Sequence, residues 1–393
     1  MKKLNKPIFS TLFFSMLATV TGVGIVVPLL PVYAHTIGAN GLYIGMIFGA
    51  FSLSRAFFLP YFGRLSDRKG RKPLIIVGLF AYSMISLAFM LSKDVNSLIF
   101  IRFFQGVASA MLMPVIQAYI GDITPKGKEG FSMGLFNMSM FFGLSLGPVL
   151  GGIINDRLNL NSAFICMGFL AFSGFLLSLF LLPPTKSEQS VYLGKTPTEW
   201  KILLRDRIIA GLFLFRFTYT LCIGVMWGFL PVVADSEFFL TSSSIGMLVM
   251  LGVFISGLIH LPMGYLADRV NKYMMIAAGG LIVVFAMCYF AWTNTSRGLF
   301  YASILFGIGG GISMPALMAL AVLKGNTSHA MGSVMALLTL AHSLGMFTGS
   351  LTAGMMMDLS LLREAFTMGA VIMGMGVGLF FIGAFKTNEF KHN

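Results

Sequence analysis

The chain has 393 residues, of which 57% are hydrophobic and only 10% are charged, whereas a soluble domain carries roughly 25% charged residues. Most of its surface must therefore face lipid or other apolar helices, which excludes a soluble globular fold. The net charge is +13, and its distribution indicates contact with anionic lipid headgroups and no nucleic-acid partner.

Apolar runs of about 20 residues, each long enough to cross a bilayer core, recur along the whole chain. They predict an all-α integral membrane protein with twelve spans. The spans are 8–34, 41–62, 73–92, 97–121, 131–154, 162–182, 208–233, 243–265, 273–293, 298–323, 330–356 and 366–386. The first run resembles a signal peptide, but its length and the lack of a cleavage site favour a retained helix.

An even number of spans places both termini on one side of the membrane. If that side is the cytoplasm, the inner segments hold twenty Lys and Arg residues, whereas the outer loops hold four. The positive-inside rule therefore predicts cytoplasmic termini. We expect an integral protein of the plasma (inner) membrane. All three cysteines fall within predicted spans, so we expect neither disulfides nor a metal site, and no cofactor.

The charged break after the second span, Gly63-Arg64-Leu65-Ser66-Asp67-Arg68-Lys69-Gly70-Arg71-Lys72, has a second copy about 200 residues later. There the chain reads Gly264-Tyr265-Leu266-Ala267-Asp268-Arg269. This duplication predicts two pseudo-symmetric six-helix bundles, residues 1–183 and 208–393. The polar linker 184–207 joins them and carries a predicted short amphipathic helix. A duplicated bundle typically encloses a mid-membrane cavity, as in secondary transporters.

The span 97–121 carries a polar stripe. Arg102, Gln105 and Gln117 fall on one helical face together with Ser109 and Met113. A central Arg costs about 2.5–3.5 kcal/mol on the insertion scale, so it is rarely kept without a role. The stripe therefore predicts a substrate or proton pathway. Arg102 lies near the start of its span, however, so snorkelling to the outer surface is an alternative.

Other spans add further candidates for this pathway. Arg55 and Arg216 are the remaining intramembrane cations, and Tyr219 and Trp227 share a face with Arg216. His260 and His342 also lie inside spans. Each histidine could carry a proton or could be a hydrogen-bonded packing residue.

Small residues recur every four positions in the span 131–154, at Gly143, Gly147 and Gly151, with Pro148 among them. Such a stripe allows close helix contact. It predicts a packing seam, a hinge against the other bundle, or both.

These motifs resemble known family signatures. The ten residues from Gly63 to Lys72 are similar to the signature between the second and third helices of the major facilitator superfamily. The motif of Leu98, Arg102, Gln105 and Gly106 and the glycine stripe resemble motifs of its twelve-helix drug:proton antiporters. The resemblance implies the major facilitator fold and a gating role for one set of residues. That set is Gly63, Asp67, Arg68, Gly70 and Arg71, with Asp268 and Arg269 as a weaker second copy.

One feature departs from that subfamily. Many of its members carry a carboxylate within the membrane, but every Asp and Glu here falls outside the predicted spans. Three intramembrane Arg residues without such a carboxylate repel cations. The cargo is therefore expected to be neutral, amphipathic or anionic. If protons are coupled, His260, His342 or an interfacial carboxylate such as Asp67 must carry them.

The sequence thus predicts a monomeric secondary transporter that exports amphipathic or drug-like molecules against inward proton flow. One alternative is an organic-anion or organophosphate exchanger that uses the intramembrane Arg residues. Another is a membrane receptor or scaffold that does not transport. No Ser/His/Asp or metal-ligand arrangement is visible, so an enzyme is not expected.

Overall fold

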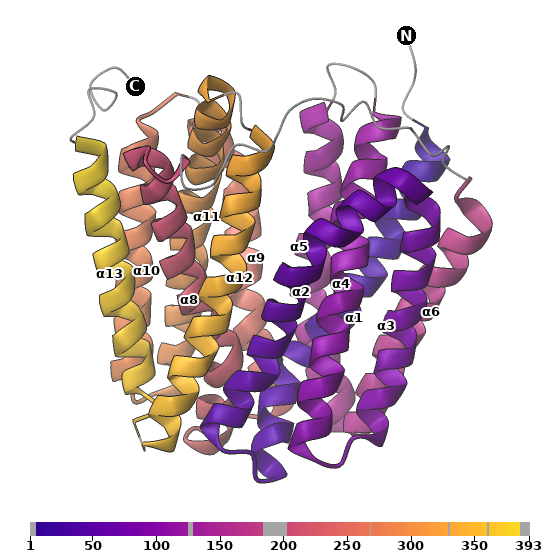
Figure 1. Cartoon of the computed structure of the whole chain (residues 1–393). Coiled ribbons are helices and arrows are strands. Elements are labelled where there is room, and N and C mark those ends of the chain that lie inside the picture. Colours follow the sequence, from indigo (N-terminus) through magenta and orange to yellow (C-terminus); the bar gives the residue numbers. More distant parts are fainter. Residues whose placement is uncertain are drawn as a thin grey trace. The chain divides into compact units, whose positions relative to one another are not determined.

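A computed structural model describes residues 5–124, 129–183, 203–267, 269–328, 331–359 and 361–385. This part of the chain contains twelve helices and no strand (Figure 1). They are α1 (Lys6–Thr36), α2 (Gly41–Lys69), α3 (Arg71–Leu91), α4 (Val95–Ile123), α5 (Glu129–Arg157), α6 (Leu160–Leu181), α8 (Arg207–Ser236), α9 (Ser242–Ala267), α10 (Lys272–Trp292), α11 (Ser296–Thr327), α12 (Met331–Asp358) and α13 (Glu364–Phe385).

All twelve helices are long and apolar enough to cross a membrane. Each predicted span coincides with one of them to within a few residues, so the predicted all-α membrane fold is confirmed. The amphipathic helix predicted in the linker falls mainly on residues 184–202, which lie outside the described residues.

The helices form two compact units. Unit 1 comprises Met1–Ala39, Ala50–Leu193 and Thr241–Met250, and unit 2 comprises Asn40–Gly49, Gly194–Leu240 and Leu251–Asn393. Each unit therefore includes the first residues of one helix from the other sequence half. The division at 183 and 208 remains a prediction, because compactness and independent movement are different properties.

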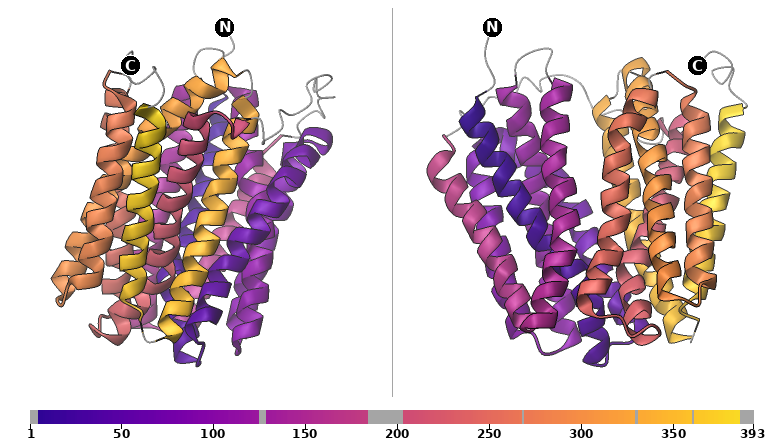
Figure 2. Two further views of the ribbon diagram at one scale, coloured as in Figure 1. Left: turned by 60° about the vertical axis from the view of Figure 1, so that its left-hand side comes forward. Right: turned by 180° about the vertical axis from the view of Figure 1, so that it is seen from behind.

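Helix packing repeats from one unit to the other. In unit 1, α1 packs against α5 and α6, and α3 packs against α4 and α6 (Figure 2). In unit 2, α8 packs against α12 and α13, and α10 packs against α11 and α13. Every pair in the first set has its counterpart in the second. This agreement is what a duplicated six-helix unit requires.

Aspartate and asparagine side chains cap several helix starts, where the first backbone N–H groups lack partners within the helix. Asp94 is one of them and accepts a bond from the Ser97 amide. The hydroxyl and amide of Ser97 hold the pKa of Asp94 below its ordinary value. The other such caps are Asn5, Asn159, Asp206 and Asn271.

The glycine stripe of α5 packs against α1. A methyl group on Gly147 would overlap the Thr21 carbonyl oxygen and lie 2.6 Å from the Gly24 Cα. In unit 2, a methyl group on Gly349 would overlap the Leu221 carbonyl oxygen of α8. The stripe is therefore a seam at which two backbones approach closely within each unit.

Replacing Gly147 with valine should lower the free energy of unfolding by about 1–3 kcal/mol, because the new side chain overpacks the α1–α5 seam. Thermal unfolding of the purified protein in detergent measures this loss as a lower midpoint. Gly134→Val in the same helix is the matched control, because an added Cβ there meets no heavy atom within 4 Å. Equal midpoints for the two variants would contradict the close approach of α1 and α5 at Gly147.

Candidate functional site

In unit 1, Arg102 on α4 lies within the helix bundle. Its side chain is 3% exposed, and its Nη1 donates to the Gln105 Oε1 at 2.7 Å. The guanidinium carbon lies 4.7 Å from the ring centre of Phe51 on α2, in a cation–π contact. Arg102 therefore does not snorkel to a surface; it points toward the residue one turn further into the helix.

Two buried hydrogen-bond donors of unit 1 are unsatisfied. The Arg55 Nε and the Gln105 Nε2 are buried and have no hydrogen-bond partner. Leaving a buried donor without a partner costs about 1–3 kcal/mol. Both atoms are donors, so a ligand that offers hydrogen-bond acceptors would complete the group.

In unit 2, three helices contribute to a second cationic group. The Arg216 Nη2 on α8 lies 3.3 Å from the His342 Nδ1 on α12, and its Nη1 lies 2.7 Å from the Met314 Sδ on α11. Tyr219 is buried one turn further along α8 and stacks on Phe306, with the ring centres 5.7 Å apart. The predicted histidine and arginine are thus neighbours, although 126 residues separate them in sequence.

Two other predicted pathway residues, Gln117 and Trp227, lie apart from these two groups. Gln117 is roughly 22 Å along α4 from Arg102, and Trp227 is roughly 16 Å along α8 from Arg216, at 1.5 Å per residue. The Nδ1 of His260 lies 3.1 Å from the Ser256 carbonyl oxygen in its own helix. The sequence pattern alone did not distinguish these positions from the grouped ones.

The charged signature between α2 and α3 contains an ion pair that the sequence did not reveal. The Arg71 Nε donates to the Asp122 carboxylate at the end of α4 at 3.1 Å, and its Nη1 donates to the Ser66 hydroxyl at 2.7 Å. Gly70 has φ +88°, a conformation that favours glycine, and is the N-cap residue directly before α3. The Asp67 side chain lies outside the described atoms.

The second copy of the signature is described only in part. Asp268 lies outside the described residues. The Arg269 guanidinium covers the Tyr265 ring at 4.1 Å. An added Cβ on Gly63 or on Gly264 would meet open space, so neither glycine is needed for close packing in this state.

Two carboxylates that the sequence analysis did not single out hold the starts of two helices. Asp156 at the end of α5 accepts bonds from the Ser242 and Ser243 amides of α9, at 3.0 and 2.8 Å. Asp358 at the end of α12 accepts bonds from the Gly41 and Leu42 amides of α2, at 2.6 and 2.9 Å. We call these two contacts the carboxylate caps. The first lies within unit 1 and the second within unit 2.

Each carboxylate cap lies next to a glycine at which two helix backbones approach closely. A methyl group on Gly152 would overlap the Ser242 carbonyl oxygen, and one on Gly354 would overlap that of Gly41. Asp156 and Asp358 each follow their glycine by four residues. The repeat could therefore have identified both carboxylates before the structure was known.

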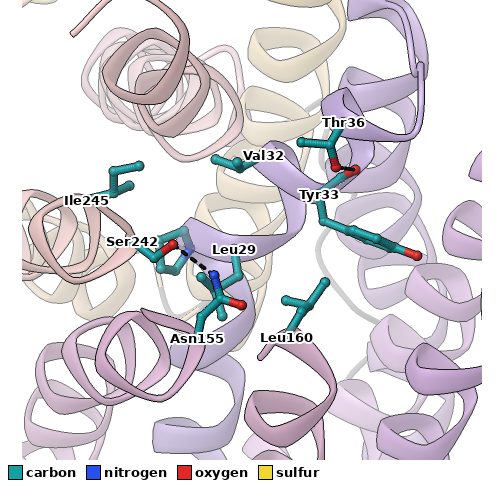
Figure 3. Close-up of a pocket in the computed structure, with 9 residues that line it drawn as sticks. Leu29, Val32, Tyr33, Thr36, Asn155, Leu160, Ser242 and Ile245 are labelled. Atoms are coloured by element: carbon teal, nitrogen blue, oxygen red, sulfur yellow. Dashed lines mark hydrogen bonds between the residues drawn. The ribbon is translucent and has the colours of Figure 1, made fainter. Parts of the chain in front are cut away.

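A small cavity of about 200 Å³ lies beside the first cap, in unit 1. The Asn155 amide, which donates to the Ser242 hydroxyl at 2.8 Å, forms part of its wall (Figure 3). None of the predicted pathway residues lines this cavity. Its lining is Pro28, Leu29, Val32, Tyr33, Thr36, Asn155, Leu160, Ser242 and Ile245.

Asp156→Asn should loosen the first turn of α9, because an amide offers one acceptor oxygen where the carboxylate offers two. Ile245 in that turn is 2% exposed, so a cysteine there reacts with maleimide mainly when the turn opens. In a background without the three native cysteines, the labelling rate should rise about fivefold, which corresponds to about 1 kcal/mol.

Asp94→Asn is the control for this experiment, because Asp94 caps only its own helix. A labelling rate that Asp156→Asn leaves unchanged, or that both variants raise equally, would show that the cap does not hold α9.

Comparisons with known proteins agree with this fold. The family model described as Major Facilitator Superfamily matches residues 12–350 and 212–392. An uncharacterized MFS-type transporter of Methanocaldococcus jannaschii is 29% identical over 375 residues, which cover 94% of this chain and 96% of that protein. The quinolone resistance protein NorA of Staphylococcus aureus is 27% identical over 392 residues, covering 96% and 95%.

Solved structures share the fold at low identity. A bacterial homolog of the human lysosomal transporter Spinster, inward-facing and occupied, has a TM-score of 0.83 at 13% identity and covers 99% of both chains. The human organic anion transporter MFSD10 has a TM-score of 0.67 at 19% identity, covering 95% of this chain and 99% of its own. These likenesses concern the fold alone.

Proposed function

The chain belongs to the major facilitator superfamily of membrane transporters, and we propose that it exports amphipathic, drug-like molecules in exchange for protons by alternating access. Membership makes it an integral membrane transporter and not an enzyme. Similarity to the quinolone resistance protein along nearly the whole chain supports drug export. The observation that carries the proposal is the buried Arg102–Gln105 pair, in which the Gln105 Nε2 has no hydrogen-bond partner.

The positions of the charged residues limit the chemical classes of cargo that we expect. Arg55, Arg102 and Arg216 lie well inside their helices, whereas every Asp and Glu of the described helices lies among the first or last three residues of its helix. An apolar bundle with internal positive charge favours neutral or anionic molecules over cations. We therefore propose cargo that offers hydrogen-bond acceptors on an aromatic or aliphatic body.

Organic-anion exchange is the second candidate function. The unpartnered donor on Arg55 and the neutral contacts of Arg216 favour it, because a carboxylate or phosphate forms paired charge-assisted bonds with a guanidinium. A receptor or scaffold without transport is the remaining alternative. It predicts no substrate-dependent flux at all.

Alternating access requires contacts that hold one state and break in the other. The Arg71–Asp122 ion pair and the two carboxylate caps are our candidates for such contacts. Each joins polar groups at helix ends, where water can replace a broken bond. The positive-inside pattern predicts that the ion pair faces the cytoplasm and the caps face outward.

The direct test is the flux of a compound panel into proteoliposomes, with and without an imposed pH gradient. A transporter that is inverted in the vesicle membrane moves exported compounds into the vesicle. If export is coupled to protons, the imposed gradient should accelerate this uptake of neutral amphipathic compounds. Transport that ignores the gradient would exclude proton exchange. Failure of every compound to move would favour the receptor alternative.

Arg102→Gln should reduce transport at least tenfold, because glutamine keeps a donor but removes the charge that the site directs at cargo. Initial flux rates per folded protein measure the effect. Arg157→Gln is the matched control, because Arg157 is the exposed last residue of α5. Equal rates for the two variants would show that Arg102 is a packing residue.

A further inference from the structure

We propose that Arg216 and His342 form a binding site for one anionic group, and that the bound anion brings a proton to His342. This inference rests on the second candidate function, the transport of organic anions. It assigns a chemical class of ligand and a proton-binding atom to the cationic group of unit 2.

The Arg216–His342 contact defines the protonation state of the histidine. A guanidinium has only donors, so in the 3.3 Å contact the His342 Nδ1 must be the acceptor. The imidazole is therefore neutral and carries its hydrogen on Nε2. As long as Arg216 keeps this contact, the Nδ1 lone pair is occupied.

Protonation of the His342 Nδ1 would break its contact with Arg216. It would remove the acceptor and place two positive charges side by side. Tyr219 on α8 and His260 on α9 lie close enough to Arg216 to interact with it electrostatically, and neither is an anion at neutral pH. The charged groups at the ends of α12 and of the helices packed against it are Arg207, Asp235, Arg297, Lys324, Asp358 and Glu364.

An incoming anion changes this balance. Two neutral groups contact Arg216, the Met314 thioether and the imidazole, and both accept weaker bonds than a carboxylate does. A carboxylate that binds the guanidinium therefore displaces them and neutralises its charge. The Nδ1 of His342 is then released, takes up a proton from the buffered solution, and donates it in a hydrogen bond to the same anion.

The charge of the cargo thus decides whether a proton is taken up at this site. An anion and its proton occupy the site together, so they cross in the same direction. A neutral cargo takes up no proton here and leaves the proton exchange of the export function unaffected. Anionic cargo therefore moves in the same direction as its proton, whereas neutral cargo is exchanged for a proton.

The test uses two probes of nearly equal shape, 2-naphthoate and the neutral 2-naphthamide. Binding to the purified full-length protein is measured by calorimetry at neutral pH in buffers of different ionisation enthalpy, which yields the protons taken up per ligand. We expect uptake of about one proton with naphthoate and none with naphthamide.

Variants identify the atoms involved. His342→Asn keeps an acceptor near the position of Nδ1 but cannot titrate. It should abolish proton uptake and weaken naphthoate binding about tenfold at acidic pH, with little change at alkaline pH. His35→Asn, in the last turn of α1 in unit 1, is the matched control and should retain uptake. Arg216→Gln should abolish naphthoate binding, while thermal stability shows that it folds.

Three results would overturn the proposal: no saturable binding of naphthoate, binding without proton uptake, or undiminished uptake in His342→Asn. Flux measurements test transport separately from binding at this site. Naphthoate that binds with a proton but is not transported supports the site and defeats organic-anion transport. If naphthamide is not transported, that result contradicts the export function and leaves the anion site unaffected.

Discussion

Positive charge inside an apolar helix bundle is the constraint on which the rest of this structure depends. A guanidinium within the membrane is costly unless protein groups replace its water. Arg102 finds a glutamine oxygen and an aromatic face, and Arg216 finds an imidazole nitrogen and a thioether. These four groups are neutral and do not cancel the guanidinium charge. We propose that this charge lets the two groups discriminate among ligands.

Duplication gives the two units the same mechanical parts but different chemistry. The glycine seams and the carboxylate caps occur in both units, at equivalent positions. The cationic groups differ, since unit 1 combines arginine with glutamine and unit 2 combines arginine with histidine. Only the second group contains a histidine, the side chain whose ordinary pKa lies closest to neutral pH. Packing was therefore kept after duplication, while the polar groups diverged.

The fold was predictable from the sequence because the bilayer allows few alternatives: an apolar run of sufficient length must become a helix. The Arg102–Gln105 contact was predictable in the same way, because residues three apart share a helix face. The Arg216–His342 contact was not, because no local spacing relates residues on different helices. Asp156 and Asp358 were overlooked because each looks like an ordinary loop acid until the two repeats are aligned. Predicted roles for Asp67 and Asp268 remain predictions.

The central claim is that the arginines inside the membrane-spanning helices set the sign of the cargo. Its most direct test compares initial transport rates in proteoliposomes for three compounds built on one naphthalene ring, with a carboxylate, an amide or a methylammonium group. The account predicts saturable transport of the carboxylate or the amide, and at least tenfold slower transport of the ammonium compound. A preference for the ammonium compound would contradict it.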